Sequence, residues 1–291
     1  MQLKHVESEP RLGELVYSAP ENWKISCLWE AHGNWMAGIY ANDNPRNRSK
    51  ILWNGEEVYS DNSETIGQPL KVGAYIGSVG ERNGVIVAFN GVIQKRFDVK
   101  WASWIGLWRN LPVTIDWNGK RNNIRECVNG SIIGTIPSTG IALSAVENHG
   151  LLFAATADSD DHKHGIACSD GTLVKVDACQ CIVLFCGKMF YSSHNRVYQY
   201  GGGSLGELAC EKIMDMRVVY KSPSNPHGVL RISGSNPDSV WDVDNMGHVR
   251  TVGVITTDNE HIGGSCFRVR ASENYFARCK HGTQGEVYRI K

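Results

Sequence analysis

The chain has 291 residues, 42% of them hydrophobic, and its 30 basic and 30 acidic side chains give a formal net charge of zero. A neutral chain lacks the strongly positive face that neutralises phosphates, which argues against capture of nucleic acid by bulk charge. No stretch approaches roughly eighteen consecutive apolar residues, and the opening MQLKHVESEP has no apolar segment of a secretory signal. We therefore expect a cytoplasmic or virion protein that does not insert into a membrane.

Short strand-like runs fill the chain, and helical periodicity is nearly absent. Runs rich in Val, Ile, Tyr, Trp and Phe alternate with Gly, Asn, Asp and Ser, which predicts an antiparallel all-β fold. In chain order these runs include SKILWN (49–54), VIVAF (85–89), SIIGTI (131–136), LLFAATA (151–157), TLVKV (172–176), CIVLF (181–185), VLRIS (229–233) and SCFRVRA (265–271).

Glycine turns between these runs recur at a regular interval. They lie at Gly55, Gly91, Gly130, Gly171, Gly202 and Gly247. Asn-Gly and Asp-Gly supply the positive φ angles of a two-residue hairpin. The average spacing of roughly 38 residues is the size of one four-stranded propeller blade, whereas a β-sandwich would not repeat at the four-strand level.

The repeat divides a single domain, 1–291, into units. They span about 22–61, 62–99, 100–138, 139–178, 179–210, 211–254 and 255–291. The second unit is the weakest, because the segment near TIGQPLK is an unconvincing first strand. We expect seven four-stranded antiparallel blades rather than six or eight.

The last unit ends at EVYRIK without an outer strand. The segment RLGELVYS (11–18) echoes NGEEVYS (54–60) and SLGELAC (204–210), which occupy the outer-strand position of their units. We predict that residues 11–19 supply the missing strand and close the ring, which would hide two sheet edges from solvent.

From about Leu12 to Lys291 the pattern resembles the β-propeller superfold. It matches no specific repeat family. Trp241-Asp242 is the dipeptide of WD40 repeats, but it occurs once and without the preceding Gly-His; paired kelch glycines do not recur, and CSDGTLV lacks the aromatic residue of an Asp-box. The resemblance implies a fold and carries no function by itself.

Three segments have side chains that could bind a metal ion. ADSDDHKHG (157–165) gathers carboxylates and imidazoles, but a solvated loop is the favoured interpretation. DVDNMG (242–247) begins like a calcium loop but has Met246 and no glutamate at the twelfth position, so a hairpin turn is predicted. Cys179 and Cys181 are expected on one face of a strand, where an apolar tract favours core packing over zinc or iron–sulfur binding. We predict buried free thiols for most of the nine cysteines, and no metal ion, cofactor or catalytic residue.

Tryptophan is concentrated before residue 118, where eight of the nine lie. Exposed indoles stack on sugars or anchor protein partners, which makes Trp53, Trp104 and Trp108 a candidate binding surface. Packing between blades is the favoured alternative. In WASWIGLW, alternation places Trp104 and Trp108 on one face and Trp101 on the other.

The function that fits these features best is a non-enzymatic propeller that binds other proteins, as a component of a larger complex such as a virion or phage tail. No nucleophile elbow, P-loop or dinucleotide fingerprint occurs. One alternative is a lectin-like or receptor-recognition propeller that binds glycans. Another is a glycoside hydrolase, which needs two carboxylates roughly 5–10 Å apart at the channel mouth.

Overall fold

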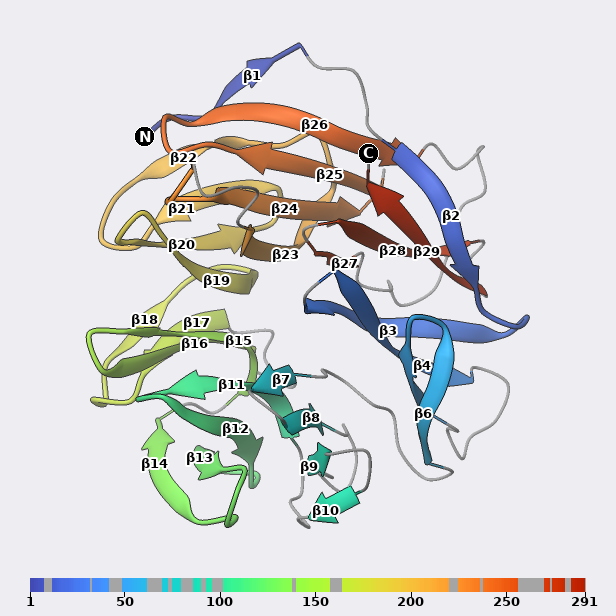
Figure 1. The fold of residues 1–291 in the computed structure, drawn as a ribbon. Helices are drawn as coiled ribbons and strands as arrows, with labels where there is room; N and C mark the ends of the chain where they lie inside the picture. The colour runs from blue at the N-terminus through green and yellow to red at the C-terminus, as the bar shows by residue number, and fades with distance from the viewer. Residues whose placement is uncertain are drawn as a thin grey trace.

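The structure, a computed structural model, contains strands and no helix in the part of the chain that it describes (Figure 1). The described residues are 1–7, 12–31, 33–41, 49–61, 70–72, 75–79, 86–89, 93–95, 102–137, 140–157, 164–219, 225–235, 238–255, 270–272, 274–280 and 284–290.

The strands follow one another with short connections. The first fourteen are β1 (Lys4–Val6), β2 (Leu12–Ser18), β3 (Trp23–Ala31), β4 (Asn34–Ala41), β5 (Ser49–Trp53), β6 (Glu56–Asp61), β7 (Leu70–Val72), β8 (Tyr75–Val79), β9 (Ile86–Phe89), β10 (Ile93–Lys95), β11 (Ala102–Trp108), β12 (Leu111–Trp117), β13 (Asn122–Glu126) and β14 (Ile132–Ile136). The others are β15 (Ile141–Asn148), β16 (Leu151–Ala157), β17 (His164–Cys168), β18 (Leu173–Lys175), β19 (Cys179–Phe185), β20 (Lys188–Ser193), β21 (Arg196–Gln199), β22 (Ser204–Glu207), β23 (Lys212–Val219), β24 (Val229–Ser235), β25 (Asp238–Val243), β26 (His248–Ile255), β27 (Arg270–Ala271), β28 (Tyr275–Lys280) and β29 (Gln284–Ile290).

The described strands form seven sheets, six with four strands and one with five. Five sheets consist of four consecutive strands: β3–β6, β7–β10, β11–β14, β15–β18 and β19–β22. The sixth joins β23–β26 to β1, and the seventh joins β27–β29 to β2. Contacts link neighbouring sheets through their first strands, among them β11 with β15, β15 with β19 and β19 with β23. The chain is an all-β single propeller with four-stranded antiparallel blades.

Glycine turns close the hairpins as the sequence predicts. Gly55, Gly130, Gly171 and Gly247 all have positive φ angles between 80° and 102°. In YGGG the positive φ belongs to Gly201 rather than to Gly202. Gly91 lies outside the described residues.

A β-bulge recurs in the first strand of five sheets, and the sequence pattern did not reveal it. The register to the second strand shifts after Ile25, Ala102, Ala142, Cys179 and Ile213. In every case the strand ends six residues later. A bulge inserts one residue, so it reverses which face the following side chains occupy.

That reversal corrects the prediction that Cys179 and Cys181 share a face. Cys179 packs with Ile182, whereas Cys181 packs with Val183 in a different cluster. Both thiols are buried, at 0% and 3% exposure, which agrees with core packing.

The N-terminal segment supplies outer strands to two sheets. β2 pairs antiparallel with β29 in a register that joins Leu12 to Ile290 and Ser18 to Glu286. β1 pairs parallel with β26, a strand that the sequence did not predict. In Figure 1, β1 lies along the outer side of β26, and β2 lies beside β29.

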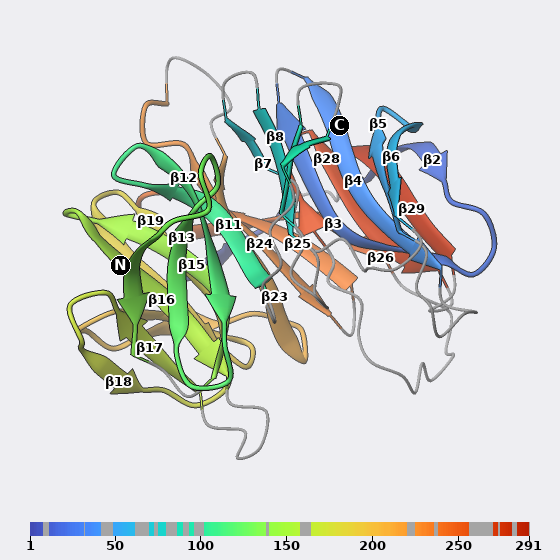
Figure 2. The ribbon, with the colours of Figure 1, turned by 90° about the horizontal axis from the view of Figure 1, so that it is seen from below.

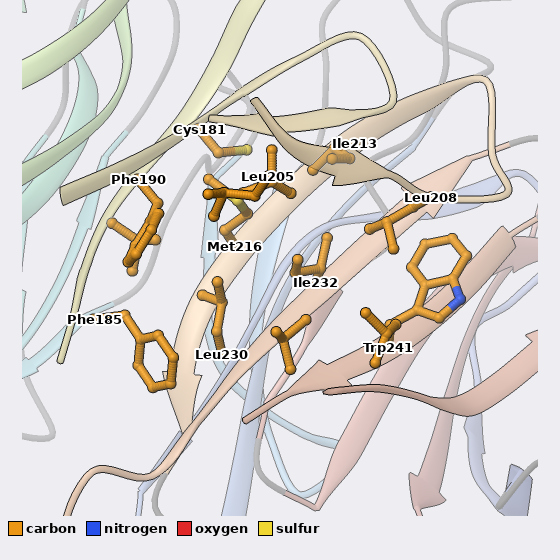
Figure 3. Close-up of a cluster of buried hydrophobic side chains, with 14 residues drawn as sticks. Cys181, Phe185, Phe190, Leu205, Leu208, Ile213, Met216, Leu230, Ile232 and Trp241 are labelled. Atoms are coloured by element: carbon orange, nitrogen blue, oxygen red, sulfur yellow. The ribbon is translucent and has the colours of Figure 1, made fainter. Parts of the chain in front are cut away.

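Apolar clusters fill the space between neighbouring sheets. The largest joins the β19–β22 and β23–β26 sheets, and in Figure 3 Leu205 and Leu208 face Ile213 and Trp241 across it. A second joins the β11–β14 and β15–β18 sheets, which lie side by side in Figure 2 as well as in Figure 1. Sheets of this size stabilise each other because each cluster removes apolar side chains of two sheets from water.

Most predicted strands are present, with altered ends. VIVAF corresponds to β9, VLRIS to β24, and the uncertain first strand of the second unit to the short β7. SCFRVRA yields only the two residues of β27, because 256–269 lie outside the described residues. No helix in the described residues is long and apolar enough to cross a membrane.

Replacing Gly13 by alanine should weaken the pairing of β2 with β29. A Cβ at this position would lie 1.5 Å from the Arg289 carbonyl oxygen, so the strands would have to separate locally. We expect a loss of roughly 1–3 kcal/mol of stability, seen as a lower Tm in calorimetry. Glu14→Ala, on the neighbouring exposed position, is the matched control. Equal melting of both variants would contradict the close pairing.

Candidate functional site

Two of the three tryptophans predicted as a binding surface are core residues. Trp104 is 8% exposed and Trp108 4% exposed, and both belong to the cluster that joins the β11–β14 and β15–β18 sheets. Their common cluster confirms that they share a face. Since neighbouring strands cover the rings, they cannot stack on a sugar, and the prediction of an indole platform at these two residues is wrong.

Trp53 has a different environment. It is half-buried at the end of β5 and, like Tyr59, packs against the buried Met36 and Ile51. Its role in binding stays a prediction. Trp101 lies outside the described residues.

Trp108 and the next residue fasten the β11–β14 sheet to its neighbour. The Trp108 indole N–H donates to the Gly150 carbonyl oxygen at 3.0 Å, and the Arg109 guanidinium lies 4.4 Å from the centre of the Trp108 ring. The Arg109 backbone N–H donates to Glu147 Oε2 at 2.6 Å. A turn of one sheet thus holds a turn of the next by hydrogen bonds, one of them charge-assisted, while the cation–π contact fixes Arg109 on Trp108 within its own sheet.

The same type of contact recurs between the β27–β29 and β3–β6 sheets. Glu30, like Glu147, is the penultimate residue of a first strand, and its carboxylate accepts bonds from the Asn274 backbone and side-chain N–H groups at 2.8 and 2.6 Å. The Tyr275 hydroxyl donates to the Gly33 carbonyl at 3.1 Å, in the position of Gly150. These glutamates are structural links between sheets.

Five exposed apolar side chains gather at one end of the β11–β14 sheet, and we call them the turn-end patch. Leu107 is the penultimate residue of β11, and Leu111 is the first residue of β12. Val128 lies in the turn after β13, and Ile132 and Ile133 begin β14. Their exposures range from 36% to 52%. Two of the three hairpins of this sheet, β11–β12 and β13–β14, turn at this end, and the Cys127 N–H donates to the Pro112 carbonyl at 2.8 Å, which joins them.

The turn-end patch holds the largest share of the exposed large apolar side chains that the described residues contain. Five of the eleven large apolar side chains that are exposed there belong to it. Single exposed apolar residues are ordinary, but clusters of them mark surfaces that contact other molecules. The exposed Arg109 lies at the same end and adds a cation to the apolar surface.

The buried charged groups have structural partners. Arg231, 1% exposed, donates from Nε to Asp242 Oδ1 at 2.8 Å and from Nη2 to Asp242 Oδ2 at 3.0 Å, and its third nitrogen bonds the Ser272 carbonyl of the next sheet. Asp116 accepts from Arg125 at 2.8 Å and from Asn123 at 2.9 Å. Both carboxylates hold neighbouring strands together.

No group of three or more metal-binding side chains occurs among the described residues. The acidic and histidine residues of 158–163 lie outside them. DVDNMG is a hairpin turn, as predicted: Asp244 accepts bonds from the Met246 and His248 N–H groups at 2.9 Å and from the His248 ring at 3.0 Å. Burial alone would raise the pKa of Asp244, but these bonds lower it below its usual value.

The described cysteines are free thiols. Burial raises the pKa of Cys127 to about 12, so the unreactive protonated form dominates at neutral pH. Cys186 is exposed, whereas the other cysteines whose side chains the structure describes are buried or partly buried.

The sequence held a partial signal for the turn-end patch. In WASWIGLW the alternation that buries Trp104 and Trp108 places Leu107 on the opposite face. Nothing local indicated that Leu107 would be exposed, because exposure depends on which other segments pack against that face.

Comparison with known proteins supports the fold and gives no family. No protein-family model matches the chain, and no curated protein matches it in sequence. The structure of BBS1N in complex with ARL6DN has a TM-score of 0.63 at 12% identity, covering 97% of this chain and 98% of that one.

Two further solved structures are similar. A chain of the mitotic checkpoint complex has a TM-score of 0.61 at 10% identity, covering 100% of this chain and 99% of that one. The Pan2 WD40 domain of Neurospora crassa has a TM-score of 0.56 at 10% identity, covering 92% and 89%. Such low identities establish the propeller fold alone.

Replacing Trp108 by alanine should destabilise the protein much more than replacing Trp53. The Trp108→Ala substitution leaves a cavity in the core and removes the bond to Gly150, which lowers the free energy of unfolding by about 3–5 kcal/mol. Trp53 is half-buried, so its replacement should cost less. Urea unfolding of the two variants gives the comparison. A Trp108→Ala protein as stable as the parent would place this indole outside the core.

Proposed function

We propose that this chain is a non-enzymatic propeller that binds another protein through the turn-end patch, as one component of a larger assembly. The observation that carries the proposal is the clustering of five exposed apolar side chains with Arg109 at one end of one sheet. The buried centre of a protein interface is more apolar than the rest of the surface, and arginine is enriched in interfaces.

The similar structures fit this function at the level of the fold. BBS1N was solved in complex with ARL6DN, and another similar chain belongs to the mitotic checkpoint complex. Both descriptions concern those proteins. The virion or phage-tail setting stays a prediction, to which these structures give no support.

The propeller we propose has seven blades, one for each described sheet, with β2 as the outer strand that closes the ring. The pairing of β2 with β29 supports this closure. In such a ring the sheets hold one another at fixed angles, so a patch on one blade is presented on a rigid base. Rigid presentation lowers the entropic cost of binding.

A double substitution tests the patch. Leu107→Glu with Ile132→Glu places two charges in the turn-end patch, and burial of an unpaired charge in an interface is costly. We expect the tagged variant to lose the partner that the parent chain co-purifies from its native cells, by roughly tenfold or more.

The matched control is Leu173→Glu, an equally exposed leucine on the outer strand of the next sheet. It should leave capture unchanged, and calorimetry should show that all variants keep the parent Tm. Equal capture by the patch variant and the control would contradict the proposed surface.

A further inference from the structure

The first six residues lie across two neighbouring sheets, far from the turn-end patch in the sheet order. The chain alternates here: Met1 and Leu3 are partly buried against the apolar cluster of the β19–β22 and β23–β26 sheets, whereas Gln2 and Lys4 are exposed. Alternation of this kind is the pattern of an extended segment with one face on a protein surface.

Hydrogen bonds join this segment to both sheets. The Leu3 N–H donates to the Leu205 carbonyl on β22 at 2.7 Å, and the Lys4 N–H donates to the Gly247 carbonyl before β26 at 2.8 Å. The Gln2 side chain donates to the Ser204 carbonyl at 3.2 Å. From Lys4 onward the segment is the parallel strand β1, paired with β26 from His248 to Arg250.

Two glycines make room for the segment. A Cβ on Gly206 would lie 2.9 Å from Leu3 Cβ, and a Cβ on Gly247 would lie 2.2 Å from the Gln2 carbonyl oxygen. Both glycines have positive φ angles, 148° and 91°. Any other residue at these positions would therefore fill the space that the segment occupies.

The walls of this space are held independently of the segment. Gly247 belongs to the turn that Asp244 fixes through the Met246 and His248 N–H groups. The apolar floor is the cluster in Figure 3, whose members come from β19 to β26. The site thus consists of an edge strand on each side, a floor of packed side chains and two glycine gaps.

The bound segment itself is weakly covered. All three residues of β1 are exposed, and Val6 is 42% exposed. Its contacts are those that any extended peptide with suitable side chains makes when it adds to a sheet edge: main-chain bonds give affinity and pockets for alternate side chains give specificity.

We propose that the groove between β22 and β26 is a peptide-binding site for an extended segment with apolar side chains two residues apart, which residues 1–6 of the same chain occupy in this structure. A partner segment of this pattern would bind by replacing residues 1–6. A second peptide can bind only while the chain's own segment has left the groove. Its apparent affinity is therefore reduced in proportion to the fraction of molecules in which the groove is empty.

The test uses the full chain with Leu3→Asp, which should release the segment while β2 stays paired with β29. The probe is a fluorescein-labelled peptide of residues 1–6, MQLKHV, followed by fluorescence anisotropy. We expect the variant to bind this peptide at least about tenfold more tightly than the parent chain. Leu3→Ala provides a milder release should the aspartate lower the Tm.

Two controls make the result specific. A peptide with aspartate in place of the leucine, MQDKHV, should bind the variant at least about tenfold more weakly, because a carboxylate would enter an apolar floor. Gly206→Ala added to the variant should weaken binding of MQLKHV, because the new Cβ takes the place of the leucine. If neither Leu3 variant binds MQLKHV better than the parent, or if both peptides bind alike, the groove is not a peptide site.

Discussion

The packing of each sheet face against its neighbour is the interaction on which the structure depends. A four-stranded sheet is too small to bury its own apolar side chains, so each cluster draws residues from two adjacent sheets. The bulge that recurs in the first strands adjusts this packing, because it changes the face on which the following side chains lie. Turn contacts at Glu30 and Glu147 then fix the sheets relative to each other.

The outer edges of the sheets are a separate constraint, and the N-terminal segment meets it in three places. Residues 1–6 bond to β22 and β26, and β2 covers β29. Each contact satisfies backbone groups that would otherwise present an open strand edge. A strand of exposed residues such as β1 can do this because a sheet edge binds main chain, with few demands on side chains.

Strand alternation and glycine turns were sufficient to predict the all-β fold, the four-strand repeat and a strand within 11–19, which the structure places at Leu12–Ser18. They were also sufficient to predict that Trp104 and Trp108 share a face. They failed for Cys179 and Cys181, because a bulge is a feature of the pairing between two strands and leaves no mark in one of them. They failed for β1, since three exposed residues have no apolar pattern, and for the turn-end patch, whose exposure depends on its neighbours.

The role of residues 12–18 as an outer strand is most directly tested by hydrogen–deuterium exchange of the intact chain, followed by mass spectrometry. Paired amides exchange only when the sheet opens, whereas amides of an unattached terminus exchange at the rate of an unfolded chain. The account predicts that peptides covering Leu12–Ser18 exchange as slowly as those covering β28 and β29. Exchange of Leu12–Ser18 at the unfolded rate, beside a protected β29, would contradict it.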